Sequence, residues 1–382
     1  MYFEILKTNS KSRARRGVLH TAHGDVQTPA FLPIGTKGTV KSVTSEELKF
    51  WGADMILANT YHLWQRPGDG LIYKAGGLHR FMNWKNAIFT DSGGYQVFSL
   101  AKMRKTTDAG VLFQFDLDGR QSMLSPEISV DIQANLGSDV ALILDDFPGY
   151  PFERQRTLEA IERTRAWAER ALAENSRIMK SGDPLNPGQK LWGIVQGASF
   201  ADLRKKSAEQ MRALDFPGYA IGGVAVGEPA EEMLKAVEYA VPHLEEEKPK
   251  HLLGVGTPYD IVRAAARGCD TFDCVIPTRE ARHGRLYISS KTENGKDAYS
   301  TMDIRKQEFA EDFAPVDSTC DCYGCLNHTR AYLRHLFSAE EPLAIRLATM
   351  HNLKFYLNLM KKIRTAIEYD YFEELCENFK NI

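Results

Sequence analysis

The 382 residues of the chain include 43% hydrophobic side chains, and the formal net charge is −2. This size and apolar content are enough to bury a large core, either in one α/β domain with an insertion or in two domains. The near-neutral charge excludes a globally basic nucleic-acid-binding chain, so any nucleic-acid surface must be local. The N-terminus has no apolar signal core and no apolar run reaches membrane-spanning length, so we expect a soluble, cytoplasmic protein.

Residues 1–29 predict short strands and turns that form an antiparallel cap before the main fold begins. After the cap, eight short apolar runs follow one another along the chain. Continuous apolar runs of this length are typical of strands buried on both faces, as in a parallel sheet. The eight predicted strands lie within residues 30–35, 54–60, 87–93, 140–146, 191–197, 218–224, 251–256 and 271–277.

Amphipathic helical patterns separate most of these runs, and several begin with a capping residue or a proline. The predicted helices are residues 45–51, 125–136, 152–174, 201–214, 229–241 and 258–267. Strands and helices that alternate eight times indicate an α/β fold, the (β/α)8 TIM barrel, with an open doubly wound sheet as the alternative.

Two segments interrupt this alternation. Residues 110–124 alternate in polarity around Asp118-Gly119, which predicts a hairpin inserted after the third strand. Residues 286–318 predict a short β excursion with a turn at Asn294-Gly295, followed by a helical region from about residue 327. Residues 326–364 hold seven Lys and Arg against two acidic residues, which suggests a basic face, although a solvated helix surface is the commoner cause.

Polar and acidic residues gather where the predicted strands end. In a barrel the carboxyl ends of the strands meet at one mouth, so these residues would share a pocket. Carboxylates that lie this close together raise one another's pKa, so one can hold a proton while another stays ionised. The strand-end residues are Asn59, Asp91, Ser92, Gly93, Gly94, Asp145, Asp146, Gln196, Gly197, Gly222, Gly223, Gly254, Val255, Gly256 and Asp273.

Such a set of residues can support chemistry at a sugar carrying a flat base. One carboxylate can attack C1′ and hold a covalent glycosyl intermediate, while a second manages the proton of the leaving group. A third can accept the N1 and N2 hydrogens of guanine, with Gln196 and glycine amides at O6 and Tyr95 stacked on the ring. Any single one of these residues can equally serve only to form a hydrogen bond from a strand end to a neighbouring loop. Their convergence on one face favours a catalytic or binding site.

Residues 271–285 combine Asp273 with Arg279, Arg282 and Arg285, spaced three residues apart. One interpretation pairs Asp273 with a cation in the core and leaves the arginines as a solvated edge. The other places a carboxylate in a site with a phosphate-binding lip beside it. A base extruded from a polynucleotide needs a positive backbone track nearby, which favours the second interpretation.

Three of the six cysteines are clustered at Cys320, Cys322 and Cys325. Three thiolates within six residues predict a metal, with tetrahedral Zn²⁺ favoured, and free thiols are the weaker alternative. A fourth protein ligand would close the site and make it structural. Spacing alone leaves His328, His335 and His351 open, although His328 is too close for an easy wrap and His351 begins a helical pattern.

Several motifs together resemble the tRNA-guanine transglycosylases, and the similarity is closest to the bacterial queuine-pathway type. The motifs are NTYHL (59–63), TDSGGYQV (90–97), VQG (195–197), GGVAVGE (222–228), FDCVIPTR (272–279) and CDCYGC (320–325) with His351. The resemblance covers residues 3–375. It implies one catalytic (β/α)8 barrel over residues 1–382, with a zinc-binding subdomain at 286–352, C-terminal helices to 382, and a homodimer.

The family is a glycosyltransferase family, and the resemblance implies its reaction for this chain. Guanine at wobble position 34 of tRNAs with G-U-N anticodons (Asp, Asn, His, Tyr) would be exchanged for a 7-deazaguanine in queuosine biosynthesis. The incoming base would most simply be preQ1, with queuine as the alternative.

Residue by residue, the resemblance implies that Asp273 is the nucleophile at ribose C1′ and Asp91 the proton acceptor and donor. Asp145 would read the N1/N2 edge of the base. The implied base-binding set is Asp91, Ser92, Gly93, Gly94, Tyr95, Asp145, Gln196 and Gly223. The implied RNA-binding set is Gly254, Val255, Gly256, Thr257, Pro258, Tyr259, Asp260, Thr278, Arg279, Glu280, Ala281 and Arg282. The implied ligands of one structural Zn²⁺ per chain are Cys320, Cys322, Cys325 and His351.

The chain departs from the family pattern at a few positions. Asp146-Phe147 stands where many bacterial members have Glu-Cys, Ala58 replaces a common Gly, and Val224 replaces a common Leu. Phe147 is much larger than Cys and can reshape the pocket near the 7-substituent of the base. Two other functions compete: a catalytically silent RNA-binding partner subunit, which would be expected to lose Asp91 or Asp273, and a retaining glycoside hydrolase, which needs neither the cysteines nor the arginines.

Overall fold

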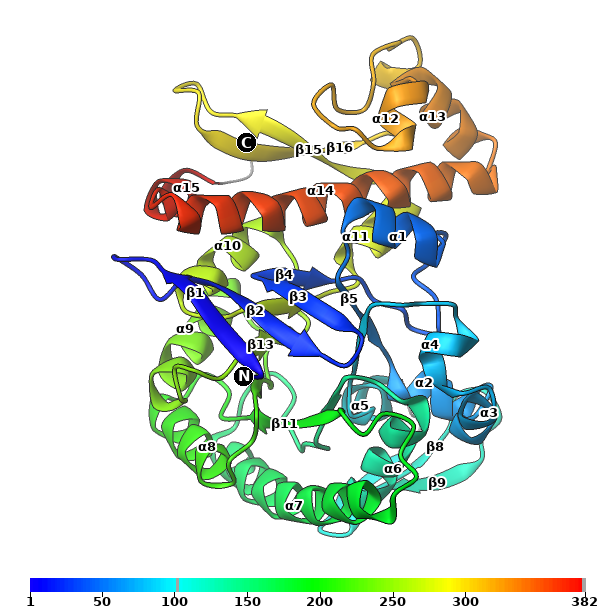
Figure 1. Cartoon of the computed structure of the whole chain (residues 1–382). Coiled ribbons are helices and arrows are strands. Elements are labelled where there is room, and N and C mark those ends of the chain that lie inside the picture. The colour runs from blue at the N-terminus through cyan, green and yellow to red at the C-terminus, as the bar shows by residue number, and fades with distance from the viewer. Residues whose placement is uncertain (101–102, 380–382) are drawn as a thin grey trace.

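The centre of the computed structural model, which describes residues 1–100 and 103–379, is a parallel sheet of eight strands curled into a nearly closed barrel (Figure 1). The strand order is β4-β14-β13-β12-β11-β10-β6-β5, and a parallel bridge between Ile34 and Leu57 joins the two ends. All eight predicted strands are confirmed, as β4 (Ala30–Leu32), β5 (Met55–Ala58), β6 (Ala87–Thr90), β10 (Val140–Leu142), β11 (Lys190–Val195), β12 (Tyr219–Ile221), β13 (Lys250–Leu252) and β14 (Thr271–Asp273).

Burial explains why these short runs form strands. Every residue of the eight strands is buried except Lys190, because side chains facing the barrel axis and side chains facing the helices are both covered. The parallel register pairs Leu252 with Phe272 and Ile221 with Leu252, so the strands end at one common edge. The residues that follow the strands are therefore brought to the same mouth.

The predicted barrel helices are confirmed, with shifts of a few residues at their ends. Thr44 and Glu47 form a capping box at α1, and Ser125 and Thr257 cap α6 and α10 with their hydroxyl groups. The helices are α1 (Ser45–Trp51), α6 (Pro126–Leu136), α7 (Arg154–Ser181), α8 (Ala201–Ala213), α9 (Ala230–Ala240), followed by the 3-10 turn η1 (Val241–His243), and α10 (Pro258–Ala266).

Short helices in the loops were not predicted, because five to seven residues are too few to show a helical period. They are α2 (Thr60–Gln65), α3 (Asp69–Lys74), α4 (Gly77–Phe81), α5 (Gly94–Leu100) and α11 (Ile276–Arg282). The equally short α1 was predictable from its capping residues. Ile276 and Pro277, predicted as the end of the last strand, instead begin α11, since a proline suits the first turn of a helix as well as the end of a strand.

Two antiparallel sheets flank the barrel. The N-terminal cap is β1 (Phe3–Thr8), β2 (Arg15–Thr21) and β3 (Gly24–Thr28), as predicted. The predicted hairpin at 110–124 is present as β8 (Gly110–Gln114) and β9 (Gln121–Leu124), and β7 (Arg104–Thr107) adds a third strand.

The C-terminal part is organised around α14 (Pro342–Glu368), which crosses the barrel and separates it from the remaining elements (Figure 1). These elements are β15 (Arg285–Lys291), β16 (Asp297–Asp303), the 3-10 turn η2 (Gln307–Phe309), α12 (Tyr323–Asn327) and α13 (Arg330–Ser338). The last helix, α15 (Phe372–Asn378), follows α14 and packs against it and against α10. The predicted subdomain, residues 286–352, runs from β15 into the first part of α14, and residues 380–382 lie outside the described residues. Over the described chain, no helix has the length and apolarity needed to cross a membrane.

Candidate active site

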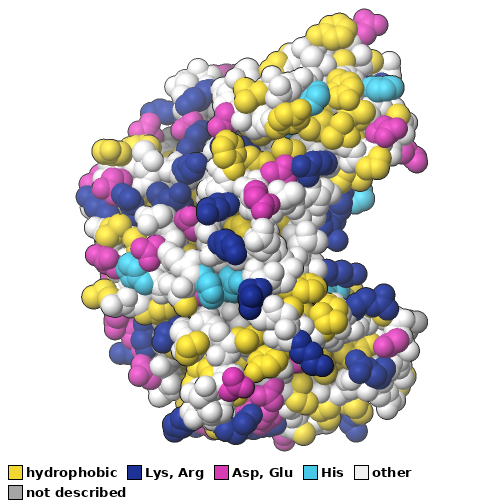
Figure 2. All heavy atoms as spheres, turned by 45° about the vertical axis from the view of Figure 1, so that its right-hand side comes forward, with side chains coloured by type: hydrophobic (Ala, Val, Ile, Leu, Met, Phe, Trp, Pro, Cys, Tyr) yellow, Lys and Arg dark blue, Asp and Glu magenta, His cyan; other side chains and the backbone are white. Residues whose placement is uncertain are grey.

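A cavity of about 550 Å³ opens where the barrel strands end. Asp91, Asp145 and Asp273 all line it, together with Asn59, Tyr95 and Arg279. Figure 2 shows that the molecule is hollowed on one side and that Lys and Arg side chains stand on both edges of this hollow. Three carboxylates from strands that are far apart in the sequence therefore share one pocket.

Asp273, the last residue of β14, is 6% exposed and is held by one oxygen. Its Oδ1 accepts hydrogen bonds from Nε2 of His251 and from the amide of Gly254, both at 3.0 Å. Over the described residues no donor reaches Oδ2, and Asp273 forms no ion pair with Lys or Arg. Oδ2 is thus the oxygen of Asp273 without a hydrogen-bond partner among the described residues.

His251, on β13, is fully buried and fixes that arrangement. Its Nδ1 lies 2.9 Å from the hydroxyl of Thr271, and its ring packs on Phe89 with centroids 4.6 Å apart. An ionised carboxylate only accepts, so Asp273 selects the tautomer with the proton on Nε2, and the Thr271 hydroxyl then donates to Nδ1.

Asp91 follows β6 and accepts three hydrogen bonds. The donors are Nδ2 of Asn59 at 2.5 Å, the amide of Thr60 at 2.8 Å and Nε2 of Gln96 at 2.9 Å. Burial nevertheless raises the pKa of Asp91 to about 6; the three donors pull the pKa down and the charge of Asp273 adds to the rise. A carboxyl group with such a pKa can both give and take a proton near neutral pH.

Asp145, after β10, contacts Gln196 and Ser92. Nε2 of Gln196 donates to Asp145 Oδ2 at 2.5 Å, and the Ser92 hydroxyl lies 3.4 Å from Oδ1. Burial raises the pKa of Asp145 to about 7, with the charge of Asp146 contributing. The like-charge effect expected from the sequence is present at both carboxylates, but burial is the larger cause.

Side chains of β11 and of the residue after it approach Gly222 and Gly223 so closely that a Cβ would not fit without a shift. A Cβ at Gly222 would lie 2.7 Å from Ile194 Cγ2, and a Cβ at Gly223 would lie 2.3 Å from Oε1 of Gln196. Gly223 also has a φ of +63°, which disfavours other residues. Oε1 of Gln196 is buried and has no hydrogen-bond partner over the described residues, so this amide retains unused hydrogen-bonding capacity. Gln196 itself does not line the cavity and lies against Gly222 and Gly223, which do.

Aromatic rings form the outer wall. Tyr95 is 50% exposed, and its ring lies nearly parallel to that of buried Phe147 with centroids 5.9 Å apart. The ring of Phe98 also packs on that of Phe147, with centroids 4.7 Å apart. The carboxylate of Asp146 does not line the cavity, because it forms ion pairs with Arg156 and Arg163, both at 2.5 Å.

The other predicted base-binding and variable positions lie near this wall. Ser92 and Gly93 line the cavity, and Gly94 begins α5 directly behind them. Val224 also lines the cavity, whereas Ala58 is buried in β5 outside the lining.

The predicted RNA-binding residues divide into exposed and buried groups. Gly254 and Arg279 are exposed, and Thr257, Tyr259, Glu280 and Arg282 are partly exposed. The remaining six are buried and support the surface from below: Val255, Gly256, Pro258, Asp260, Thr278 and Ala281. Arg282 turns back to donate to the carbonyl of Thr278 at 3.0 Å.

A second cavity of about 530 Å³ adjoins the first through Arg279. It is lined by Arg285, Arg305, Lys306 and His283 as well as Glu280 and Asp303. Sequence reasoning missed Arg305 and Lys306, because they lie beyond β16 and only the β15–β16 pairing returns them to α11. It also missed the role of His251 as a support for Asp273, since a histidine inside an apolar strand carries no signal of its partner.

The cysteine cluster lies beside α14, and His351 is the histidine that the fold brings to it. His351 Nδ1 lies 3.3 Å from Sγ of Cys325 and 3.8 Å from Sγ of Cys322, and the four ligand atoms, including that of Cys320, are within 4.8 Å of one another. His351 Nε2 lies 2.7 Å from the carbonyl of Tyr287, which keeps the proton on Nε2 and leaves the Nδ1 lone pair for a metal. Three sulfurs and one imidazole suit one structural metal ion.

The fold, the acidic pocket and this cluster define the class of protein as a TIM-barrel enzyme with a structural metal site. A family model described as "Queuine tRNA-ribosyltransferase" matches residues 10–382. Proteins named queuine tRNA-ribosyltransferase from Listeria welshimeri and Listeria innocua are each 48% identical over 377 residues, which is 99% of this chain and 95% of theirs. One from Caldanaerobacter subterraneus is 47% identical over 99% of this chain and 96% of its own. The chain belongs to the queuine tRNA-ribosyltransferase family and is a tRNA-guanine transglycosylase.

Proposed function

We propose that this enzyme replaces guanine at wobble position 34 of tRNAs with G-U-N anticodons by a 7-deazaguanine base, through a covalent intermediate between Asp273 and ribose C1′. The observation that carries the proposal is the presence of three carboxylates in one cavity with three different hydrogen-bond environments. Each environment suits a different step. A tRNA substrate is also consistent with the cytoplasmic location that we propose.

Asp273 is the nucleophile in this proposal. Its Oδ2 forms a bond to C1′ while the bond from C1′ to guanine N9 breaks, and Asp91 gives its proton to the departing base. In the second half, ionised Asp91 takes the N9 proton of the incoming base, which attacks C1′ and releases Asp273. The proton on Asp91 is thereby restored, so the cycle balances without any other reagent.

Asp145 reads the base in this proposal. When ionised it accepts the N1 and N2 hydrogens of guanine, and these donors replace the one that Gln196 now provides. Gln196 is then free to turn its amide toward O6, beside the amide of Gly223. Tyr95 stacks on the ring from the exposed wall.

The RNA is held in this proposal by Arg279, which borders both cavities, and by the basic groove beside it. Arg285, Arg305 and Lys306 would contact phosphates on one side of the flipped nucleotide, and the exposed part of residues 254–260 would contact the other. Asp303 and Glu280 pair with Arg305 and Arg285 in the free protein and would be displaced from them.

preQ1 is the incoming base that the pocket favours. Phe147 is buried, contacts the rings of Tyr95 and Phe98, and lines the cavity with a full aromatic ring. A small aminomethyl substituent is accommodated more easily beside that ring than the larger substituent of queuine, which remains the alternative.

Zn²⁺ is the metal that we assign to Cys320, Cys322, Cys325 and His351, because thiolate and imidazole ligands in a closed set favour it. It would be structural and present once per chain. We further propose that the metal-binding segment at 286–352 is a subdomain of a single catalytic barrel domain, and that two copies form a homodimer. Exposed apolar side chains near the cluster, Phe313, Tyr323 and Leu326, give such a dimer a surface to bury, and light scattering tests it.

The decisive experiment is displacement of labelled guanine from a tRNA carrying G34, with preQ1 and queuine compared as incoming bases. Faster release with preQ1 supports the proposal, and faster release with queuine moves the assignment to the alternative base. Binding of tRNA with no displacement by either base would indicate a silent RNA-binding subunit instead.

A further inference from the structure

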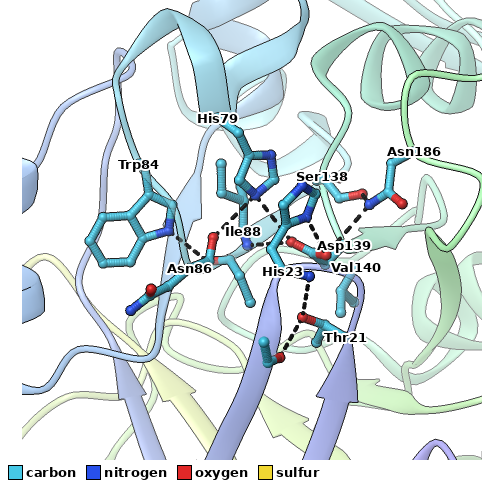
Figure 3. Close-up of polar contacts among 12 residues, drawn as sticks. Thr21, His23, His79, Trp84, Asn86, Ile88, Ser138, Asp139, Val140 and Asn186 are labelled. Atoms are coloured by element: carbon cyan, nitrogen blue, oxygen red, sulfur yellow. Dashed lines mark hydrogen bonds and ion pairs between the residues drawn. The ribbon is translucent and has the colours of Figure 1, made fainter.

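A second group of metal-ligating side chains lies at the end of the barrel opposite to the candidate active site. His23 is in the turn between β2 and β3, His79 is on α4, and Asp139 directly precedes β10 (Figure 3). Their ligand atoms all lie within 4.8 Å of one another, a spacing shared with the cluster of three cysteines and His351. Neither the reaction nor the RNA surface uses them.

Asp139 is the centre of this group and is 2% exposed. Nδ1 of His23 lies 2.8 Å from its Oδ1, and Nε2 of His79 lies 3.3 Å from its Oδ2. The amide of Ile88 donates to Oδ2 at 2.9 Å, which fixes the carboxylate from behind. A ligating carboxylate held by a further hydrogen bond is the arrangement that orients metal ligands in proteins.

The atoms that converge here are electron-pair donors. Nε2 of His79 faces Asp139 and also the carbonyl oxygen of Asn86 at 3.1 Å, and over the described residues both of these partners are acceptors. His23 Nδ1 likewise faces the carboxylate. Such a group is held together either by a proton on each ring nitrogen or by one shared cation.

We propose that His23, His79 and Asp139 bind one divalent transition-metal ion, with the carbonyl oxygen of Asn86 as a fourth ligand. Two imidazoles and a carboxylate suit Zn²⁺, Co²⁺ or Ni²⁺, whereas Mg²⁺ and Ca²⁺ prefer oxygen alone. Tetrahedral ligands about 2 Å from such an ion stand roughly 3.3 Å apart. The separations from His79 to Asp139 and to Asn86 already have nearly this value.

His23 is the ligand that has to move. Its ring stacks on that of His79 with centroids 3.5 Å apart and an angle of 18°, so it must turn out of the stack to direct Nδ1 at the ion. The turn is feasible because His23 lies in a hairpin turn and its side chain is 32% exposed. The bound ion then joins the N-terminal cap to the barrel. Because the unfolded chain does not assemble this site, binding stabilises the folded state relative to the unfolded state.

Cobalt titration of the zinc-loaded, full-length enzyme tests the proposal. Co²⁺ bound by nitrogen and oxygen absorbs in the visible without the near-ultraviolet charge-transfer band of a thiolate ligand, so this site is distinguishable from cobalt exchanged into the cysteine cluster. We expect one additional Co²⁺ per chain with the thiolate-free spectrum, and a higher melting temperature when it binds.

Two substitutions make the test specific to the cluster. His23→Phe keeps an aromatic ring against His79 and removes the ligand atom, and it should abolish the additional Co²⁺ and the rise in melting temperature. His20→Phe is the matched control, because His20 is on the same hairpin, 37% exposed and paired with Asp25 at 2.7 Å; it should leave both unchanged. No additional Co²⁺ in the wild type, or its retention in His23→Phe, overturns the proposal and leaves a hydrogen-bonded group without metal.

Discussion

Nε2 of His251 lies 3.0 Å from Oδ1 of Asp273, and this contact makes the two oxygens of the carboxylate different. Oδ1 is held by the imidazole and by the amide of Gly254, whereas Oδ2 has no hydrogen-bond partner among the described residues. The carboxylate that we propose as the nucleophile is thus oriented before any substrate arrives, which lowers the entropy that the proposed reaction must lose.

Replacing His251 should slow formation of the covalent intermediate without weakening base binding. Loss of one hydrogen bond to a charged group corresponds to about a 10- to 100-fold lower kcat. His251→Phe keeps the packing on Phe89 and removes the donor, while His251→Gln retains an amide donor and should recover part of the rate. Single-turnover kinetics with tRNA check this, and an equal rise in the KM for the base would contradict a positioning role.

Asp273→Asn should abolish the covalent adduct between protein and tRNA, because an amide cannot attack C1′ as a carboxylate does. The adduct is measured on denaturing gels after mixing enzyme with tRNA in the absence of an incoming base. Asp118→Asn, in the turn between β8 and β9 away from the pocket, is the control and should form the adduct normally. An adduct that survives in Asp273→Asn would remove the assignment of the nucleophile.

Guanine affinity should increase as pH rises toward 7 and then level off. The pKa of Asp145 in the free protein is raised to about 7, and only the ionised carboxylate accepts both N–H groups of the base. The same raised pKa has the opposite effect on stability. Between about pH 4 and pH 7 the folded protein keeps a proton on Asp145 that the unfolded chain has released. The free energy of unfolding therefore falls as the pH rises from about 4 to about 7. Calorimetry at several pH values checks the affinity, and Asp145→Asn should bind weakly with no such pH dependence.

Cys322→Ala should reduce the metal content of the cysteine cluster and lower the melting temperature, because a closed set of four ligands contributes folding energy. Elemental analysis together with thermal unfolding measures both effects. Cys376→Ala, which removes a partly buried cysteine on α15, should leave the metal content unchanged. Well-folded wild-type protein without metal at this cluster would disprove the structural role.

Arg279→Gln should weaken tRNA binding and decrease the slope of log affinity against log salt by about one unit, as expected for one lost phosphate contact. Binding of free guanine should change little. Arg165→Gln, on α7 and paired with Glu169, is a charge-matched control. A parallel loss of guanine and tRNA binding in Arg279→Gln would point to damage of the pocket rather than to lost RNA contact.

The barrel could be predicted because its buried strands appear in the sequence as short apolar runs and its helices as amphipathic patterns. Runs such as residues 140–144 are apolar throughout, and the capping residues Thr44, Ser125 and Thr257 lie at helix starts. The short α11 could not be predicted, since its seven residues contain Pro277 and three charged side chains. Its helical form determines which arginines are exposed.

The candidate site was predictable only where strand ends carry unusual residues. Asp91, Asp145 and Asp273 are conspicuous after apolar runs, and the parallel register brings them together. The sequence could not show that Asp146 points away from the cavity and pairs with Arg156 and Arg163. Adjacent residues point to opposite sides of an extended chain, and the two arginines come from α7, which no local pattern connects to Asp146. The pair of cavities joined at Arg279 depends on long-range packing that no local pattern encodes.

Helix α14 carries His351 in its first half and Tyr356 five residues later, and the hydroxyl of Tyr356 donates to the carbonyl of Gly256 at 2.5 Å. The metal cluster and the loop after β13 are therefore attached to the same rigid rod. The C-terminal segment cannot be exchanged between relatives as an independent cassette, because its ligand-bearing helix is also a wall of the barrel. Chimeras should retain activity only when α14 and the loop at 254–260 come from the same parent.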